Sequence, residues 1–259
     1  MNDRELRPVL EGRALCKNYG GLRAVVDVSF EVRAGEILGI VGPNGAGKTT
    51  LFDVITGLTP ATSGDVLLGG VSIADASVHR RCALGLARTF QQPTIADSLT
   101  VLENLYLAAS FRRNRREGGR AGDIAEAVRH LDFVGLTDRA DTPAGPLGVF
   151  DKKRLMLATA LATNPRVLLL DEPFGGLNPQ EIDHVMRLIR TLRDGGLAVV
   201  VIEHVMRALT SLADRVLVMH HGAELFVGTP SEMLADPQVI EVYLGQRHGA
   251  DLTQREPRA

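Results

Sequence analysis

The stretch Gly42-Pro43-Asn44-Gly45-Ala46-Gly47-Lys48-Thr49 decides the fold, because it fits the pattern G-x-x-x-x-G-K-[ST] at every defined position. It directly follows Ile37–Val41, an apolar run of the kind that forms buried strands, and it leads into a helical pattern over Lys48–Thr56. In this order, strand, glycine-rich loop and helix make a phosphate-binding loop, whose inward-facing N–H groups and helix dipole hold phosphate oxygens. We therefore expect a nucleoside triphosphate site.

The residues of this loop have distinct expected roles. Lys48 should reach the β- and γ-phosphates, and the Thr49 hydroxyl should ligate a Mg²⁺ ion that bridges those phosphates. The loop alone leaves ATP and GTP open as alternatives. The expected nucleotide-binding residues of this stretch are Gly42, Pro43, Asn44, Gly45, Ala46, Gly47, Lys48, Thr49 and Thr50.

Two later apolar runs, Val167–Leu170 and Leu197–Ile202, end in polar side chains. Parallel strands bind ligands at their carboxyl ends, so these side chains should meet beside the phosphate loop. Asp171 is then expected to hold Mg²⁺, directly or through water, and Glu172 to orient and deprotonate the water that attacks the γ-phosphorus. His204 could donate a hydrogen bond to the γ-phosphate. Together with the loop, these residues predict a hydrolytic site.

The alternation of apolar runs with helical patterns is typical of an α/β protein with a doubly wound parallel sheet. Residues 10–36 predict an antiparallel hairpin with its turn at Tyr19-Gly20-Gly21, laid on the edge of the core. A second strand pair is expected at Arg215–Met219 and Ala223–Val227.

Between about Pro93 and Asn164 the pattern becomes helical, with helices expected at Val101–Ser110, Asp123–Val134 and Lys152–Thr163. We expect a single domain over residues 8–245, with this helical lobe inserted at about 93–164, and a C-terminal tail at 246–259. The basic segment Phe111–Arg120 is expected to be a solvated linker.

The composition excludes several classes of protein. Hydrophobic residues make up 45% of the 259 residues and charged residues 23%, which is ordinary for a folded globular protein, and the formal net charge is -2. Nucleic acid is not an expected partner, because binding to phosphate backbones needs an excess of positive charge. The N-terminus lacks a secretion signal, and no apolar stretch approaches the ~18 residues of a membrane span. We expect a cytoplasmic protein that reaches a membrane through partners.

With these motifs in place, the chain resembles the ABC ATPase family from about Leu10 to Gly245. The resemblance implies a RecA-like P-loop NTPase core with a small antiparallel β subdomain and an inserted helical lobe. It implies ATP and Mg²⁺ as cofactors, since Tyr19 falls at the aromatic position that stacks on adenine. The other matching positions are Gln91 for the glutamine that touches Mg²⁺ and the permease-facing lobe, Asp171 and Glu172 for the magnesium and base carboxylates, Gly176-Leu177-Asn178 for the dimer-contact loop and His204 for the switch histidine.

Within that family the motifs of this chain resemble those of importers of branched-chain amino acids and related small solutes. The resemblance implies transmembrane permease subunits, a second ATP-binding cassette and an external solute-binding protein as partners, with the chain peripheral on the inner face of the cell membrane. A lipopolysaccharide export cassette and a soluble ABC ATPase outside transport are the alternatives. The features that favour import are Ala87-Arg88-Thr89-Phe90-Gln91, Glu103-Asn104-Leu105, Gly175-Gly176-Leu177-Asn178-Pro179, Ile202-Glu203-His204 and the ending Gly228-Thr229-Pro230 through Val242-Tyr243-Leu244-Gly245.

One segment departs from the family pattern. The signature Leu-Ser-Gly-Gly-Gln is expected just before the helix at Lys152–Thr163, and Leu147-Gly148-Val149-Phe150-Asp151 stands there instead. The bulk of Phe150 and the charge of Asp151 should weaken contact with a γ-phosphate, and this contact belongs to the partner subunit's nucleotide. We therefore expect a heterodimer with a cassette that carries a regular signature. A non-hydrolysing regulatory cassette is the rival interpretation, opposed by Lys48, Asp171, Glu172 and His204.

Overall fold

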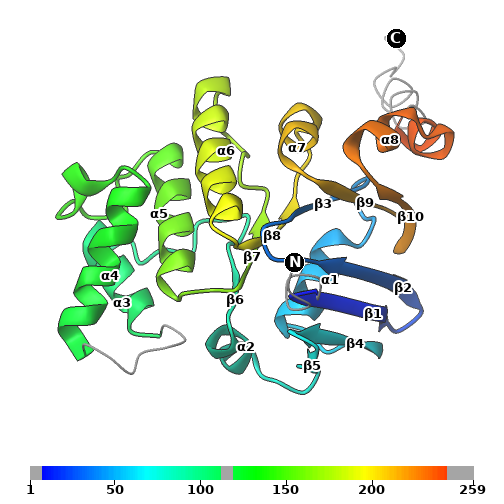
Figure 1. Cartoon of the computed structure of the whole chain (residues 1–259), viewed down its shortest axis with the longest axis horizontal. Coiled ribbons are helices and arrows are strands. Elements are labelled where there is room, and N and C mark those ends of the chain that lie inside the picture. Colours follow the sequence, from blue (N-terminus) through cyan, green and yellow to red (C-terminus); the bar gives the residue numbers. More distant parts are fainter. Residues whose placement is uncertain (1–7, 112–118, 244–259) are drawn as a thin grey trace, which may run out of the picture.

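The protein is described here by a computed structural model that covers residues 8–111 and 119–243 (Figure 1). The expected linker at 111–120 and tail at 246–259 lie largely outside these residues. The larger sheet runs in the order β10 (Ala223–Gly228), β9 (Arg215–His220), β3 (Ile37–Val41), β8 (Ala198–Ile202), β7 (Val167–Asp171) and β6 (Leu86–Arg88).

All neighbours in this sheet are parallel except β10 and β9, which form the expected antiparallel pair. Strands β3, β7 and β8 are buried along their whole length, which explains their unbroken Val, Ile and Leu runs. The strands predicted from those runs are confirmed. Because β3, β7 and β8 are adjacent and parallel, the residues that follow them emerge at one edge.

A second, antiparallel sheet confirms the predicted hairpin and enlarges it. Its order is β2 (Leu22–Val32), β1 (Leu10–Tyr19), β4 (Ser63–Leu68) and β5 (Val71–Ser72). Helix α1 (Lys48–Thr56) packs between the two sheets, since Leu51, Phe52 and Ile55 share one buried cluster with residues of both. The phosphate loop therefore opens into a helix that is held on two sides.

The opposite face of the larger sheet is covered by α6 (Pro179–Asp194) and α7 (Met206–Leu212). The first turn of α6 is capped reciprocally by Asn178 and Glu181. Two short helices, α2 (Val78–Leu84) and α8 (Pro230–Ala235), lie before β6 and after β10. No helix within the described ranges is long and apolar enough for a bilayer crossing.

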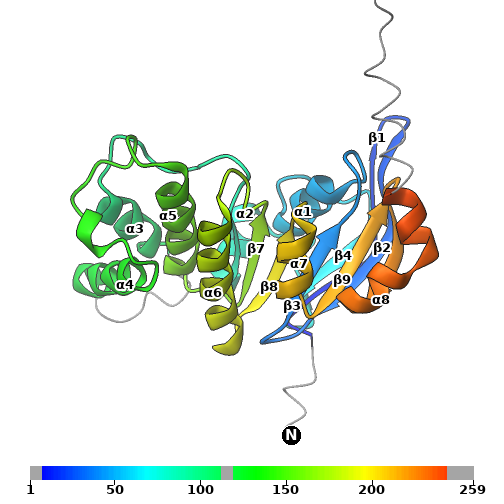
Figure 2. The same ribbon diagram turned by 90° about the horizontal axis from the view of Figure 1, so that it is seen from above.

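The predicted helical lobe is built from α3 (Val101–Ala109), α4 (Gly119–Phe133), a 3-10 turn (Thr137–Arg139) and α5 (Val149–Ala162). Figures 1 and 2 show α5 between the other lobe helices and α6 of the core. The three predicted lobe helices are confirmed, but α5 begins three residues earlier than expected. Val149, Phe150 and Asp151 of the signature segment therefore lie in the first turn of this helix, and Gly148 is its N-cap. The division into one domain at 8–245 stays a prediction.

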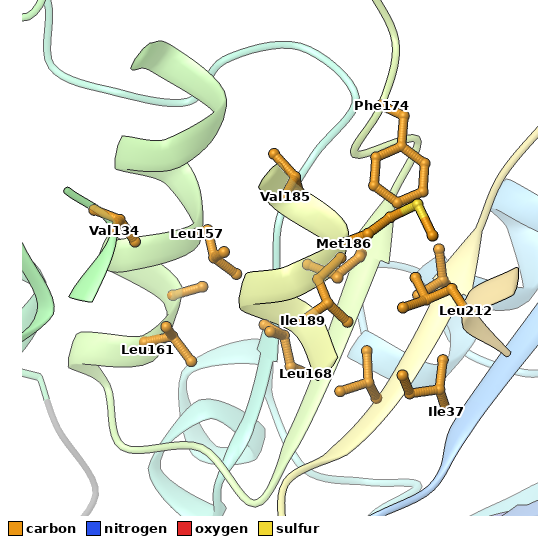
Figure 3. Packing of buried hydrophobic residues seen from close by; sticks show 14 of the residues in the cluster. Ile37, Val134, Leu157, Leu161, Leu168, Phe174, Val185, Met186, Ile189 and Leu212 are labelled. Atoms are coloured by element: carbon orange, nitrogen blue, oxygen red, sulfur yellow. The ribbon is translucent and has the colours of Figure 1, made fainter. Parts of the chain in front are cut away.

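The lobe and the core share a continuous apolar interior (Figure 3). Val185, Met186 and Ile189 of α6 point between Leu157 and Leu161 of α5 on one side and the central sheet on the other, as Figure 3 shows. These α6 side chains are at most 5% exposed. Burial of each side chain of this size contributes about 2 kcal/mol, so α6 firmly joins the lobe to the sheet.

Candidate functional site

The phosphate loop joins the end of β3 to the start of α1. Gly42 and Gly47 have positive φ angles of 150° and 97°. A Cβ on Gly42 would lie 2.1 Å from the carbonyl oxygen of Met219, and one on Gly47 would lie 2.2 Å from that of Ala24. Both positions therefore exclude any side chain, and only glycine lets the loop close against its neighbours.

The side chain of Lys48 lies inside the loop that it follows. Its Nζ donates hydrogen bonds to the carbonyl oxygens of Gly42, at 2.7 Å, and Pro43, at 2.9 Å. Burial lowers the pKa of Lys48, while the carboxylates of Glu172 and Asp171 act in the opposite direction. The ammonium is thus bound by the loop and lies within electrostatic reach of Asp171 and Glu172, while its contact with the β- and γ-phosphates stays a prediction.

Glu172 is the first residue after β7, and both of its carboxylate oxygens have partners. Oε1 lies 2.6 Å from Nε2 of His204, the second residue after β8. Oε2 accepts a hydrogen bond of 2.7 Å from the side-chain amide of Gln91. Three side chains predicted from separate motifs therefore meet at one carboxylate, beyond the ends of adjacent strands.

Asp171 lies one residue earlier, at the buried end of β7, and is paired with an arginine. Nη2 of Arg88 donates to its Oδ2 at 2.7 Å, and Nη1 donates to Oδ1 of Asp53 in α1 at 2.6 Å. The Arg88 side chain is only 5% exposed, and its guanidinium lies 5.3 Å from the ring centre of Phe52 and 4.8 Å from that of Phe90. Arg88 thus connects the helix of the phosphate loop to β7.

A pocket of about 730 Å³ opens over the phosphate loop. This volume suits a molecule of nucleotide size. Asp171 is not among the described lining residues and lies behind them, since its side chain is 6% exposed. The lining residues are Leu22, Arg23, Ala24, Asn44, Gly45, Ala46, Gly47, Lys48, Thr49, Thr50, Gln91, Glu172, His204 and His221.

The donor set at this pocket fits a magnesium ion. Mg²⁺ prefers oxygen ligands and is usually held by one or two protein groups together with phosphates and water. Thr49 is exposed at the start of α1, and Gln91 supplies an amide oxygen. Arg88 contacts one carboxylate oxygen of Asp171, Oδ2, which leaves Oδ1 as the second. A closed cluster of three acidic or histidine ligands is absent from the described residues, and Mg²⁺ bound with a nucleotide does not require one.

Comparisons with known proteins agree with this geometry. A family model described as "ABC transporter" matches residues 25–175, which include the phosphate loop and both carboxylates after β7. The chain belongs to the ABC transporter family. It is an ATPase of that family, with the P-loop NTPase fold that the sequence predicts. A second model, "Branched-chain amino acid ATP-binding cassette transporter", matches residues 225–249.

Curated relatives of this cassette include subunits of two kinds of transporter. The chain is 37% identical to the high-affinity branched-chain amino acid transport ATP-binding protein BraF of Pseudomonas aeruginosa, over 93% of this chain and 99% of BraF. It is 35% identical to LivG of Salmonella typhimurium, a protein of the same description, with the same coverage. It is also 35% identical to the lipopolysaccharide export system ATP-binding protein LptB of Escherichia coli, over 92% of this chain and 97% of LptB.

Solved structures give the same result for the fold. A nucleotide-free ATP-binding cassette from an ABC transporter superposes with a TM-score of 0.83 at 28% identity, covering 92% of this chain and 99% of that one. A structure of an ATP-binding cassette of an ABC transporter in its ADP conformation gives 0.82 at the same identity and coverage. ATP-binding subunits of this family work with transmembrane permease components, so the cassette is one part of a transporter.

Tyr19 does not line this pocket, whereas the predicted residues from Asn44 to Thr50 do, and Gly42 and Pro43 line an adjoining pocket that shares Asn44, Gln91, Glu172 and His204. Tyr19 ends β1, is 47% exposed, and has the Lys17 ammonium 4.8 Å from its ring centre. The pocket wall at this hairpin comes instead from Leu22, Arg23 and Ala24, just past the turn. Stacking of Tyr19 on adenine therefore stays a prediction.

The altered signature segment is held by contacts with both the lobe and α6 of the core. The Phe150 ring lies 5.5 Å from the ring of His184 in α6, edge to face, and the Arg154 guanidinium lies 4.4 Å from the Phe150 centre. The Asp151 carboxylate forms ion pairs with Arg154 and, at 3.2 Å, with Arg139. The expected repulsion of phosphate by Asp151 is corrected accordingly, because two arginines largely neutralise its charge.

Three charged residues of the site were not predicted from the sequence. Arg88 and Lys153 contact the ends of β7 from other elements, and Glu203 is buried between β8 and His204. Burial raises the pKa of Glu203, while backbone N–H groups, including those of Val205 and Phe174, act to lower it. For Glu203 the available signal was position, since it directly follows a predicted strand, whereas Arg88 ends β6, which was not predicted.

Proposed function

We propose that this cassette hydrolyses ATP with Glu172 as general base and drives an importer of branched-chain amino acids or related small solutes. The observation that carries the catalytic part is the placement of the Glu172 carboxylate in the loop pocket, within hydrogen-bond distance of His204 and Gln91. The match of residues 225–249 to the branched-chain family, with BraF and LivG as relatives, supports the substrate class.

In the proposed mechanism, the N–H groups of the phosphate loop and the Lys48 ammonium bind the phosphates of ATP. Glu172 accepts a proton from the water whose oxygen attacks the γ-phosphorus. The bond between the γ-phosphorus and the oxygen that bridges it to the β-phosphate breaks, and that oxygen leaves as part of ADP. His204 donates a hydrogen bond toward the γ-phosphate in exchange for its contact with Glu172. Thr49, Asp171 and Gln91 would hold Mg²⁺, which supplies positive charge against the phosphate oxygens.

We propose that closure of two cassettes on ATP is passed to permease subunits through Gln91 and the helical lobe. A cleft of about 250 Å³, lined by Phe90 but not by Gln91 itself, supports this role, because residues of β6 and α2 of the core and of α5 of the lobe all line it. An external solute-binding protein would deliver the substrate. The chain would lie peripherally on the inner face of the cell membrane.

The second cassette is proposed to be a different chain with a regular signature. Phe150 packs against His184 of α6, and Asp151 pairs with Arg139 and Arg154, so both side chains have partners within this chain. The phosphate loop of this chain is complete, so its own ATP would be hydrolysed when the partner supplies the signature. A dimer of this chain alone with full activity would contradict the heterodimer.

The catalytic proposal is tested with Glu172→Gln in the transporter purified through a tag on this chain. Mg²⁺-dependent ATPase activity should fall by roughly 100-fold or more, because the base is lost, while ATP binding remains. Glu181→Gln, at the first turn of α6 and outside the pocket, is the matched control and should keep full activity. Undiminished turnover in Glu172→Gln would exclude Glu172 as the base.

Lipopolysaccharide export is the second candidate, favoured by the 35% identity to LptB over nearly the whole chain. Uptake of labelled leucine, isoleucine and valine by cells that lack this chain separates the two. Loss of uptake, restored by the wild-type chain and not by Glu172→Gln, supports import. Normal uptake together with defective lipopolysaccharide at the surface would replace import by export.

A further inference from the structure

Lys153 lies in the second turn of α5 and reaches from the helical lobe to the catalytic edge of the sheet. Its Nζ donates a hydrogen bond of 2.8 Å to the backbone carbonyl oxygen of Glu172 and lies 3.4 Å from that of Gln91. The side chains of these two residues meet over the pocket, at 2.7 Å. One ammonium group from the lobe thus contacts the backbones of both residues.

The backbone of Glu172 is in an unfavourable conformation. Its φ angle is 48°, in the left-handed region, where a residue with a Cβ is less stable by about 1 kcal/mol or more. Its N–H donates to the carbonyl oxygen of Ile202 at 2.9 Å, and its own carbonyl oxygen accepts from Lys153 at 2.8 Å and from the Gly175 N–H at a longer 3.3 Å. The carboxylate reaches His204 and Gln91 from this backbone conformation, so the direction of the side chain depends on these backbone contacts.

The surroundings of the ammonium direct it toward the carbonyl groups. The adjoining cavity, of about 20 Å³, is lined largely by apolar side chains, among them Phe90, Met156 and Leu170. Burial lowers the pKa of Lys153, whereas the carboxylates of Glu203, Glu172 and Asp171 act to raise it. The group therefore has few polar partners other than the backbone oxygens of Glu172 and Gln91.

We propose that Lys153 is a positioning residue for the base: it stabilises the left-handed backbone of Glu172 and so keeps its carboxylate directed at the pocket. The inference rests on the proposed role of Glu172 in hydrolysis. Lys153 belongs to α5, the helix that begins at the signature segment. A shift of α5 against the core therefore changes the hydrogen bond from Lys153 to Glu172. The helical lobe then acts on the base of its own subunit through one hydrogen bond.

The first experiment compares Lys153→Met with Lys152→Met in the transporter purified through this chain. Methionine keeps the apolar stem of the side chain and removes the donor. Lys153→Met should lower kcat by about 10- to 100-fold, since small displacements of catalytic groups have effects of this size. KM and the Kd of a fluorescent ATP analogue should change less than about 2-fold. Lys152, which pairs with the exposed side chain of Asp97 at 3.8 Å, should tolerate the change.

A second comparison separates positioning from general stability. In a Glu172→Gln background, Lys153→Met should leave the residual turnover unchanged, because the group that it positions is already lost. Lys153→Arg, which retains a donor, should recover at least half of the lost kcat. If residual turnover falls again in the double variant, or Lys153→Arg is no better than Lys153→Met, the proposal is wrong.

The outcomes also distinguish this inference from the proposed function. An inactive Glu172→Gln together with an unchanged kcat in Lys153→Met overturns the role of Lys153 alone. Full activity in Glu172→Gln overturns both. Should Lys153→Met fail to fold, judged by circular dichroism and thermal unfolding, Lys153→Gln replaces it in the same comparisons, because it retains a similar stem without the charge.

Discussion

The phosphate loop and the signature segment of this cassette are built on opposite principles. The loop consists of backbone packed against backbone: Gly42 and Gly47 leave no room for a Cβ, and the N–H of Gly222 donates to Ala46 at 3.1 Å. The signature segment is held by side chains: Phe150 packs against His184 of α6, and Asp151 pairs with Arg139 of the lobe. A site formed by closely packed backbone tolerates few substitutions, whereas a segment held by side-chain contacts can be substituted without loss of the fold.

The sharpest test of this difference is Gly47→Ala. The added Cβ would lie 2.2 Å from the Ala24 carbonyl oxygen at a φ of 97°, so the loop must move. ATP affinity should fall by roughly 100-fold, or about 2.7 kcal/mol. Equilibrium binding of a fluorescent ATP analogue measures it.

The control for that variant is Gly45→Ala. Gly45 also has a positive φ, of 79°, but a Cβ there would meet no heavy atom of the described chain within 4 Å. This variant carries backbone strain alone, about 1 kcal/mol, and should bind ATP much more tightly than Gly47→Ala. Equal affinities would mean that close packing does not define the loop.

The helical lobe should be more sensitive to acid than the core, because it buries His130. Burial, with Arg129 as a second cause, lowers the pKa of His130 to about 4, while Glu126 acts in the opposite direction. Between the unfolded-state value near 6.5 and about 4 only the unfolded state binds the proton, so stability falls as pH falls through this window. The loss for this one group should be about 2 kcal/mol between pH 8 and pH 5.

Thermal unfolding of the wild-type chain and of His130→Gln at the two pH values measures the contribution of His130 to the pH dependence of stability. The difference in stability between the two proteins should shrink, or change sign, on acidification. A difference that is the same at both pH values would show that His130 titrates normally in the folded lobe.

The smallest expected effect comes from Asp151→Gln, which introduces the residue of the usual signature. Loss of the ion pairs with Arg139 and Arg154 should lower stability by about 1 kcal/mol, since the glutamine amide keeps part of the hydrogen bonding. ATP binding to the loop of the same chain should not change. Chemical denaturation and the same ATP-analogue assay measure the two quantities.

Gly148→Ser is the companion variant for the signature segment. Gly148 is the N-cap of α5 without a side-chain cap bond, and a Cβ there meets no heavy atom of the described residues within 4 Å. Serine should be tolerated or stabilise by a few tenths of a kcal/mol. A large loss of stability in Gly148→Ser would show that the segment is as constrained as the phosphate loop.

Much of the fold and of the site could be predicted from local sequence. The loop motif and the apolar runs before Asp171 and His204 locate three adjacent strands, and parallel strands bring their ends together. Strand β6, of three residues, and the short β5 were missed because they are too short for a periodic pattern. The early start of α5 was missed because Gly148 gives no capping signal.

The roles of Arg88 and Lys153 could not be predicted for a different reason. Arg88 meets Asp171 across 83 positions of sequence, and Lys153 meets the Glu172 carbonyl across 19. No local pattern encodes such contacts, which arise from how β6 and α5 pack beside β7. The positions of single motifs were therefore predictable, while the links between them required the structure.

The left-handed backbone of Glu172 has a consequence for selection on this position. Glycine adopts that conformation freely, so a chain that exchanged its base for glycine would relieve the strain and fold more readily. Stability alone would favour that exchange, and only the need for turnover opposes it. A duplicated cassette that no longer needs to hydrolyse ATP would thus be expected to lose the glutamate at this position early. The residue found there would then indicate whether a cassette still hydrolyses ATP.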